Sequence, residues 1–269
     1  MGKMTWYTPE TLEEVLPLLE QEGVYPHGGG TFLLMGGMKK IRGLIDLDRI
    51  PLHRFKALKS FIEIGASLTY AEVAENIRKM DPDHVLVKAL SKAASTPLRN
   101  RITIGGTVSV FPAWSDLMGP LVVLDSEVVT VGPKGGTYPV VRYAKEPAIR
   151  KKSLVTAVKF RRYPWEAFYH REVRTRFDYP AFTVTILSKR SGNKIEDIRI
   201  VVSGCSGKFA RLETVEEFLR GKPATGLDPE EIAAHADVRF PAKKGLDPGY
   251  LTHCFRVALR RGLEGIRGE

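Results

Sequence analysis

Two short glycine-rich segments contain residue types that bind anions: Gly28–Thr31, which reads Gly-Gly-Gly-Thr, and Thr103–Thr107, which reads Thr-Ile-Gly-Gly-Thr. Because glycine has no side chain, backbone N–H groups beside it can approach a ligand closely and form a concave anion-binding site. Each segment also carries threonine hydroxyls. The pair predicts that two separate parts of the chain converge on one phosphate-bearing cofactor, with two ordinary tight turns as the alternative.

Other chemical motifs are weaker. The spacing of Gly28–Gly30 differs from the G-x-G-x-x-G of dinucleotide-binding folds, and no segment matches the phosphate loop of nucleoside-triphosphate hydrolases. The histidines include no i, i+4 pair, and Cys205 and Cys254 are too few for an iron–sulfur cluster or a structural zinc site. Ser203–Gly207 superficially resembles a nucleophile turn, but it follows a predicted hairpin strand. A metal site and a hydrolase are both disfavoured.

Composition narrows the class of protein. The chain has 269 residues and a net charge of +10, with 43% hydrophobic and 27% charged residues. The basic residues are dispersed, without the continuous stripe or reading motif of a nucleic-acid-binding protein, so no nucleic-acid partner is expected. No apolar run approaches the roughly 18 residues of a membrane span. With no secretory signal and two cysteines, the chain is expected to be cytoplasmic with reduced thiols.

The order of predicted elements divides the chain into three stretches that each mix strands and helices. The first is a β-α-β unit whose second strand leads into Gly28–Thr31. The last has two strands joined by the hairpin signal Ser191–Asn193, followed by helices. Strands followed by helices favour an α+β fold over a repeated βαβ array. The predicted domains are 1–59, 60–164 and 165–269.

The middle stretch carries the second glycine segment. A helix is predicted to begin with the capping-box spacing Thr69-Tyr70-Ala71-Glu72, and another spans Val85–Ala94 and stops before Pro97. Thr103–Thr107 follows as a turn. The apolar run Leu121–Leu124 is predicted to be a strand.

The residues around the second glycine segment carry a more specific pattern, which is Arg99-Asn100-Arg101, then Thr-Ile-Gly-Gly, then Asp116. This pattern resembles the FAD-binding subunit of the molybdenum hydroxylases, the family of xanthine dehydrogenase and of the medium subunit of aerobic carbon monoxide dehydrogenase. The Gly-Gly-Gly-Thr segment, with Leu33-Leu34 after it, resembles that family's first flavin loop, and Leu44–Leu47 resembles the strand that follows. The resemblance covers nearly the whole chain.

The resemblance implies a vanillyl-alcohol-oxidase-type (PCMH-type) FAD-binding fold. Two α+β subdomains hold FAD, and a C-terminal α+β domain follows, with a three-stranded antiparallel sheet and helices. The chain departs from the family pattern at Thr107, where relatives usually have asparagine, and at Phe111–Ala113, where they commonly have Ala-Ser-Pro. Threonine has one hydrogen-bond donor where the asparagine amide has two.

The same resemblance implies the site residues. Asp116 is expected to accept hydrogen bonds from the ribityl or ribose hydroxyls, and Leu154 to lie close to the isoalloxazine ring. His170 or Arg171 is expected to be the basic residue near the flavin. Replacing Gly105 by valine is expected to abolish FAD retention and leave a folded protein. The residues expected to bind the cofactor within the two glycine segments are Gly28, Gly29, Gly30, Thr31, Phe32, Thr103, Ile104, Gly105, Gly106 and Thr107.

The implied function is that of an electron-transfer oxidoreductase subunit. Substrate is hydroxylated on a large subunit with a molybdenum cofactor, and electrons reach FAD on this chain through a small [2Fe-2S] subunit. They leave to an external acceptor such as NAD or a quinone. No residue of this chain needs to act as acid or base on the organic substrate. Two alternatives stay open, a stand-alone flavin oxidoreductase and a non-catalytic scaffold that has lost FAD.

Overall fold

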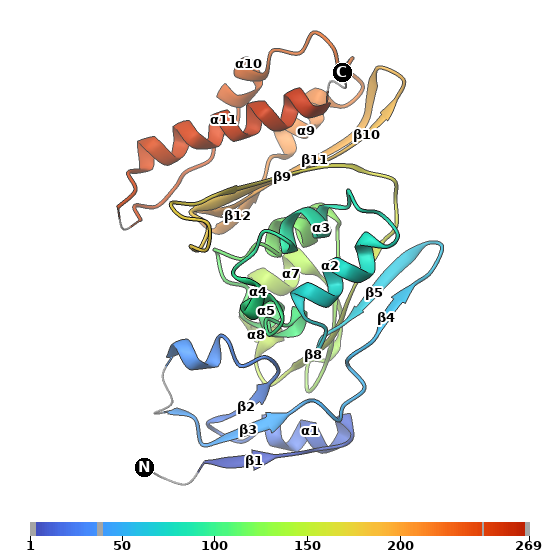
Figure 1. Ribbon diagram of the computed structural model, residues 1–269, viewed down its shortest axis with the longest axis vertical. Helices are drawn as coiled ribbons and strands as arrows, with labels where there is room; N and C mark the ends of the chain where they lie inside the picture. Colours follow the sequence, from blue (N-terminus) through green and yellow to red (C-terminus); the bar gives the residue numbers. More distant parts are fainter. Residues whose placement is uncertain (1–3, 37–39, 244, 267–269) are drawn as a thin grey trace. The chain divides into compact units, whose positions relative to one another are not determined.

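A computed structural model describes residues 4–36, 40–243 and 245–266. Contacts between residues group the chain into two units, each built from segments that are separate in the sequence (Figure 1). The division into three consecutive domains stays a prediction. The first unit consists of Met1–Asn76, Ser95–Phe111 and Leu124–Arg162, and the second of Ile77–Ala94, Pro112–Val123 and Tyr163–Glu269.

A small parallel sheet in the first unit carries the first glycine segment. Its strand order is β1-β3-β2, and Gly43 of the central strand pairs with Thr5 and Val24. Val15 of the adjoining helix and Ile45 of the central strand share one buried apolar cluster. The glycine segment follows the last residue of β2, at the carboxyl end of this sheet. The elements are β1 (Thr5–Tyr7), α1 (Leu12–Leu19), β2 (Val24–His27), η1 (Leu33–Gly36) and β3 (Gly43–Asp46).

A five-stranded antiparallel sheet forms the rest of the first unit, in the order β4-β5-β8-β6-β7. Helix α5 packs against β5 and β8, which places the second glycine segment on this sheet. The strands are β4 (Phe55–Ala57), β5 (Phe61–Gly65), β6 (Glu127–Val131), β7 (Gly136–Pro139) and β8 (Leu154–Arg161). The helices are α2 (Tyr70–Arg78), which begins in this unit, α4 (Thr96–Arg99), α5 (Ile104–Val110), α7 (Val140–Lys145) and α8 (Pro147–Arg150).

The second unit is built on a four-stranded antiparallel sheet with the order β12-β11-β10-β9. Helix α11 lies along this sheet and packs on β9 and β10 (Figure 1). The strands are β9 (Glu166–Glu172), β10 (Phe182–Ser191), β11 (Lys194–Cys205) and β12 (Lys208–Arg211). The helices are α3 (Val85–Leu90), α6 (Met118–Val123), α9 (Glu213–Leu219), α10 (Pro229–Ala234) and α11 (Pro248–Ile266).

Strand β10 is buried along most of its length because both faces of this sheet are covered. Val184 and Ile186 lie in the apolar cluster that includes α11, and a Cβ added to Gly262 would lie 2.5 Å from Ile186 Cδ1. On the other face, a Cβ added to Gly119 of α6 would lie 2.4 Å from Thr185 Oγ1. Successive side chains of a strand point to opposite faces. Alternate residues of β10 therefore pack under α11 and under α6.

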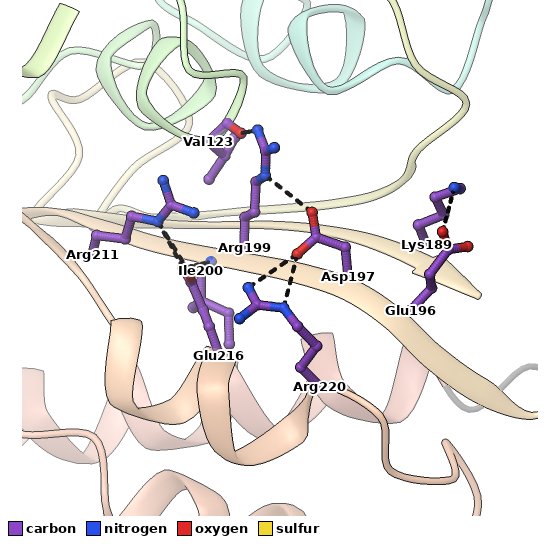
Figure 2. A network of polar contacts seen from close by, with 9 residues as sticks. All are labelled: Val123, Lys189, Glu196, Asp197, Arg199, Ile200, Arg211, Glu216 and Arg220. Atoms are coloured by element: carbon purple, nitrogen blue, oxygen red, sulfur yellow. Dashed lines mark hydrogen bonds and ion pairs between the residues drawn. The ribbon is translucent and has the colours of Figure 1, made fainter. Parts of the chain in front are cut away.

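Polar contacts fasten β11 to helices α9 and α6 (Figure 2). Glu216 of α9 is 2% exposed, and its carboxylate accepts hydrogen bonds from the Ile200 N–H at 2.7 Å and from Arg211 Nε at 3.1 Å. Arg199 Nη1 donates to the carbonyl oxygen of Val123, the last residue of α6, at 2.9 Å. A buried carboxylate is costly unless it is paired and hydrogen-bonded, and Glu216 has both kinds of partner. The two sets of contacts link α9 and α6 to β11.

Two sequence predictions about strands are wrong. Of the strand predicted at Leu121–Leu124, the first three residues are the end of helix α6, whose residues are all buried. A fully buried helix lacks the polar face that separates it from a buried strand in sequence, so a short apolar run is ambiguous. The predicted three-stranded C-terminal sheet has four strands. The short strand β12 lacks an alternating apolar pattern, and it turns back directly from the end of β11.

Candidate functional site

The first glycine segment has backbone N–H groups without acceptors among the residues that the structure describes. It follows β2 directly, and Gly30 has a φ of +70°, a conformation that favours glycine. Among the hydrogen bonds of the described residues, none has the N–H of Gly29, Gly30 or Thr31 as its donor. Successive N–H groups in a turn can form a concave anion-binding site. The segment therefore supplies donors of the kind a pyrophosphate needs.

The two glycine segments are in contact. A Cβ added to Gly28 would lie 3.0 Å from Thr103 Oγ1, and a Cβ added to Gly29 would lie 1.4 Å from the carbonyl oxygen of Arg101. The Arg101 side chain adds a second contact, because its Nε and Nη2 donate to the carbonyl oxygen of Gly29 at 3.2 and 3.1 Å. The structure thus brings predicted site residues from both segments side by side, and the close backbone approach requires glycine at position 29.

The second glycine segment is the first turn of helix α5 rather than the isolated turn that the sequence predicts. Thr103 is the N-cap of this helix. The N–H groups of the first helical residues all have acceptors: those of Ile104, Gly105 and Gly106, which lack partners within a regular helix, are bonded to other groups, and that of Thr107 makes the first bond of the helix itself. The hydrogen bonds run from the N–H groups of Ile104 to Leu68 O (2.9 Å), Gly105 to Ala66 O (2.8 Å), Gly106 to Thr103 Oγ1 (3.1 Å) and Thr107 to Thr103 O (3.1 Å).

Side chains in the second segment also bind within the protein. Thr107 Oγ1 donates to the carbonyl oxygen of Thr103 at 3.1 Å and accepts from the Tyr70 hydroxyl at 3.0 Å. A Cβ added to Gly105 would lie 2.6 Å from the Cβ of Ala66, so this glycine permits close packing of α5 on its sheet. These contacts hold the second segment in place, and the first segment packs against it.

Phe32 and Leu154 are the predicted apolar contacts of the first unit, and they differ in exposure. Phe32 lies directly after the first glycine segment and is 42% exposed. Leu154 is 4% exposed and belongs to the buried cluster that includes Val15 and Ile45. Phe32 is therefore accessible to a ligand bound at the first segment. The predicted place of Leu154 beside a flavin ring stays a prediction.

Asp116 and His170 belong to the second unit, where both are held by polar contacts. Asp116 is 6% exposed, and its Oδ1 accepts from the Tyr169 hydroxyl and from Arg171 Nε, each at 2.7 Å. Burial raises the pKa of the Asp116 carboxyl above its ordinary value, although the Arg171 guanidinium and the Tyr169 hydroxyl act to lower it. His170 Nε2 lies 3.0 Å from Glu172 Oε2. Their predicted roles toward a flavin stay predictions.

The chain matches the family described as "FAD binding domain in molybdopterin dehydrogenase" over residues 2–161, which is more than half of its length. The chain belongs to this family. FAD is accordingly its cofactor, and the chain is a component of an FAD-dependent oxidoreductase of the molybdenum hydroxylase type. Both glycine segments lie within the matched range. The donors of the first segment fit the anionic pyrophosphate of FAD, since backbone N–H groups bind phosphate oxygens through charge-assisted hydrogen bonds.

Individual relatives cover most of the chain. The medium chain of glyceraldehyde dehydrogenase from Sulfolobus acidocaldarius is 27% identical over 244 residues, which are 86% of this chain and 86% of that one. The medium chain of carbon monoxide dehydrogenase from Hydrogenophaga pseudoflava is 25% identical, with 87% and 85% covered. Quinoline 2-oxidoreductase from Pseudomonas putida 86 has the same fold, with a TM-score of 0.89 at 16% identity over 99% of this chain and 97% of that one. The family resemblance and the flavoprotein fold predicted from the sequence are confirmed.

Sequence reasoning missed one residue of the candidate site, Arg101. The Arg-Asn-Arg run served only as part of the family pattern, although it places a guanidinium directly before the second glycine segment. The contact of Arg101 with Gly29 joins residues 72 positions apart. No local pattern contains such a contact, and the presence of an arginine beside a glycine-rich segment is the only signal that could have suggested it.

Proposed function

We propose that this chain is the medium, FAD-binding electron-transfer subunit of a molybdenum hydroxylase-type dehydrogenase. The observation that carries the proposal is the set of backbone donors at Gly29, Gly30 and Thr31, held at a contact of the two glycine segments in a member of an FAD-binding family. Bound flavin accepts electrons one at a time and can release them as a pair. The residues of this chain bind and orient the cofactor, and they tune it electrostatically.

In the proposed complex the first glycine segment holds the pyrophosphate through its N–H groups. The second segment supports the first, and its Gly106 leaves room for the Thr103 hydroxyl that caps α5. Phe32 is exposed directly after the donors, where an aromatic side chain can cover part of the bound cofactor. The positions of Leu154 and His170 beside the ring, and of Asp116 at the ribityl or ribose hydroxyls, are proposed on the family resemblance alone.

The proposed partners are a large subunit with the molybdenum cofactor and a small [2Fe-2S] subunit. Support comes from the names of the relatives, which are medium chains of larger enzymes. The external electron acceptor, NAD, a quinone or another, is also proposed. In the part of the chain that the structure describes, no helix is both long and apolar enough to cross a membrane. The cytoplasmic location stays a prediction.

Flavin content of the purified chain tests the proposal. We expect a yellow protein with the absorption bands of oxidised flavin, and FAD as the only flavin released by denaturation. A colourless protein that does not regain these bands after incubation with FAD would overturn the proposal and favour the scaffold alternative. Co-expression with the neighbouring genes then separates the remaining candidates. Two further chains should purify with this one if it is a subunit, and a stand-alone flavin oxidoreductase would purify without them.

A further inference from the structure

Arg101 holds the first glycine segment by its backbone. Both Nε and Nη2 of its guanidinium donate to the same acceptor, the carbonyl oxygen of Gly29, at 3.2 and 3.1 Å. The Arg101 backbone is fixed in turn, because its N–H donates to Leu98 O at 2.9 Å, beside the end of α4. The guanidinium therefore contacts the glycine segment from a backbone position that is itself fixed by a hydrogen bond.

The contact of Arg101 with the Gly29 carbonyl also determines the direction of the Gly30 N–H. The carbonyl oxygen of Gly29 and the N–H of Gly30 belong to one planar trans peptide group, in which they point in opposite directions. Holding the oxygen on Arg101 thus fixes the N–H of Gly30 on the side away from Arg101. Among the described residues, that N–H has no acceptor in the protein.

A charged donor on the carbonyl also changes the strength of the N–H. Hydrogen bonds in a chain polarise one another, so a peptide group whose oxygen binds a guanidinium has a stronger donor at its nitrogen. An anion is the acceptor that gains most from such a donor, because charge-assisted hydrogen bonds are about twice as strong as neutral ones.

We propose that Arg101 is a positioning residue for FAD, which orients and polarises the Gly29–Gly30 peptide so that the Gly30 N–H binds the pyrophosphate. Arg101 acts through the glycine segment and needs no contact of its own with the cofactor. The inference rests on the proposed function, since it takes the first glycine segment as the place where the pyrophosphate binds.

Arg99 offers a matched control for a test in the full-length chain. It carries the same charge two positions away, but its Nη2 donates to Thr96 Oγ1 at 2.8 Å within its own helix. Arg101→Met should raise the dissociation constant for FAD about tenfold, because a hydrogen bond with a charged partner is lost, and Arg99→Met should change it less than about twofold. Flavin fluorescence on the apoprotein measures both constants.

The amide proton of Gly30 gives a readout that does not depend on the cofactor. In ¹⁵N-labelled, FAD-free protein, its resonance should move upfield in Arg101→Met, because the peptide loses its polarising partner, and stay in place in Arg99→Met. Arg101→Lys keeps the charge and one donor, and should restore part of the FAD affinity. It also serves as the test variant if Arg101→Met does not fold.

Failure of the inference is distinct from failure of the proposed function. Wild-type protein that does not bind FAD would overturn the function itself. Wild-type protein that binds FAD, with Arg101→Met binding equally well or Arg99→Met binding equally badly, would overturn only the role of Arg101. An unmoved Gly30 resonance in the folded Arg101 variant would do the same.

Discussion

The two glycine segments look alike in sequence and differ in structure. In the first, the N–H groups of Gly29, Gly30 and Thr31 have no acceptor among the described residues, and the segment is held by a side chain on its carbonyl. In the second, the N–H groups of Ile104 to Thr107 are all bonded within the protein, and Gly105 packs against Ala66. Among the described residues, the first segment thus has three consecutive N–H groups without an acceptor, whereas in the second segment only the N–H of Thr103, which precedes the helix, has none.

The difference shows that glycine serves two distinct physical purposes in one site. At Gly30 it permits a positive φ that a side chain would make strained. At Gly105 it permits a helix to approach a sheet more closely than a Cβ allows. Substitutions in the first segment should therefore affect cofactor binding, and those in the second should affect folding. Three substitutions test this division, taken from the largest expected effect to the smallest.

Replacing Gly105 by valine should destabilise the protein itself. A Cβ at this position would lie 2.6 Å from Ala66 Cβ and 3.0 Å from Ala66 O, in a buried contact between α5 and its sheet. Overpacking of this kind costs about 3 kcal/mol, which urea unfolding of the FAD-free protein can measure. The sequence alone predicts a folded protein that loses FAD. A stable variant without FAD would restore that expectation and break the division between the segments.

Replacing Gly29 by alanine should weaken FAD binding far more than it destabilises the fold. The new Cβ would lie 1.4 Å from Arg101 O, so the segment must move off its support and its donors lose their alignment. Loss of charge-assisted hydrogen bonds should raise the dissociation constant roughly a hundredfold, while unfolding free energy falls by about 1 kcal/mol. Flavin fluorescence and urea unfolding measure the two quantities.

Gly192→Ala provides the control for that comparison. Gly192 lies between β10 and β11 with a φ of +57°, and a Cβ there would meet no atom within 4 Å. An alanine at this position would therefore have a strained backbone but no steric clash, and FAD affinity should stay unchanged. Equal losses of affinity in Gly29→Ala and Gly192→Ala would mean that the effect is general strain rather than displacement of the donors.

Local patterns in the sequence predict local structure well. The capping box at Thr69 is confirmed, because Glu72 Oε2 accepts from the Thr69 N–H at 2.9 Å and Thr69 Oγ1 accepts from the Glu72 N–H at 3.3 Å. The hairpin signal at Ser191–Asn193 is confirmed by the pairing of β10 with β11. Both features involve residues a few positions apart, and the types of these residues determine their hydrogen bonds.

The roles of the two glycine segments could not be predicted in the same way. Whether the N–H groups of Ile104 and Gly105 are available depends on Leu68 and Ala66, which follow β5 and approach them only in the folded unit. Whether Gly29 can be replaced depends on Arg101. The family resemblance supplied the fold and the cofactor, but it assigned the same role to both segments, because a motif records residue types and not the acceptors that surround them.

Replacing Thr107 by valine should have the smallest effect, and it addresses the position where relatives usually have asparagine. The hydroxyl joins the Tyr70 hydroxyl to the carbonyl oxygen of Thr103, so its loss should lower the free energy of unfolding by about 1 kcal/mol. A double-mutant cycle with Tyr70→Phe should show coupling, since the two hydroxyls share one hydrogen bond. FAD affinity should change little. A large loss of affinity with unchanged stability would place Thr107 in contact with the cofactor, and the second segment would then take part in binding as well as support.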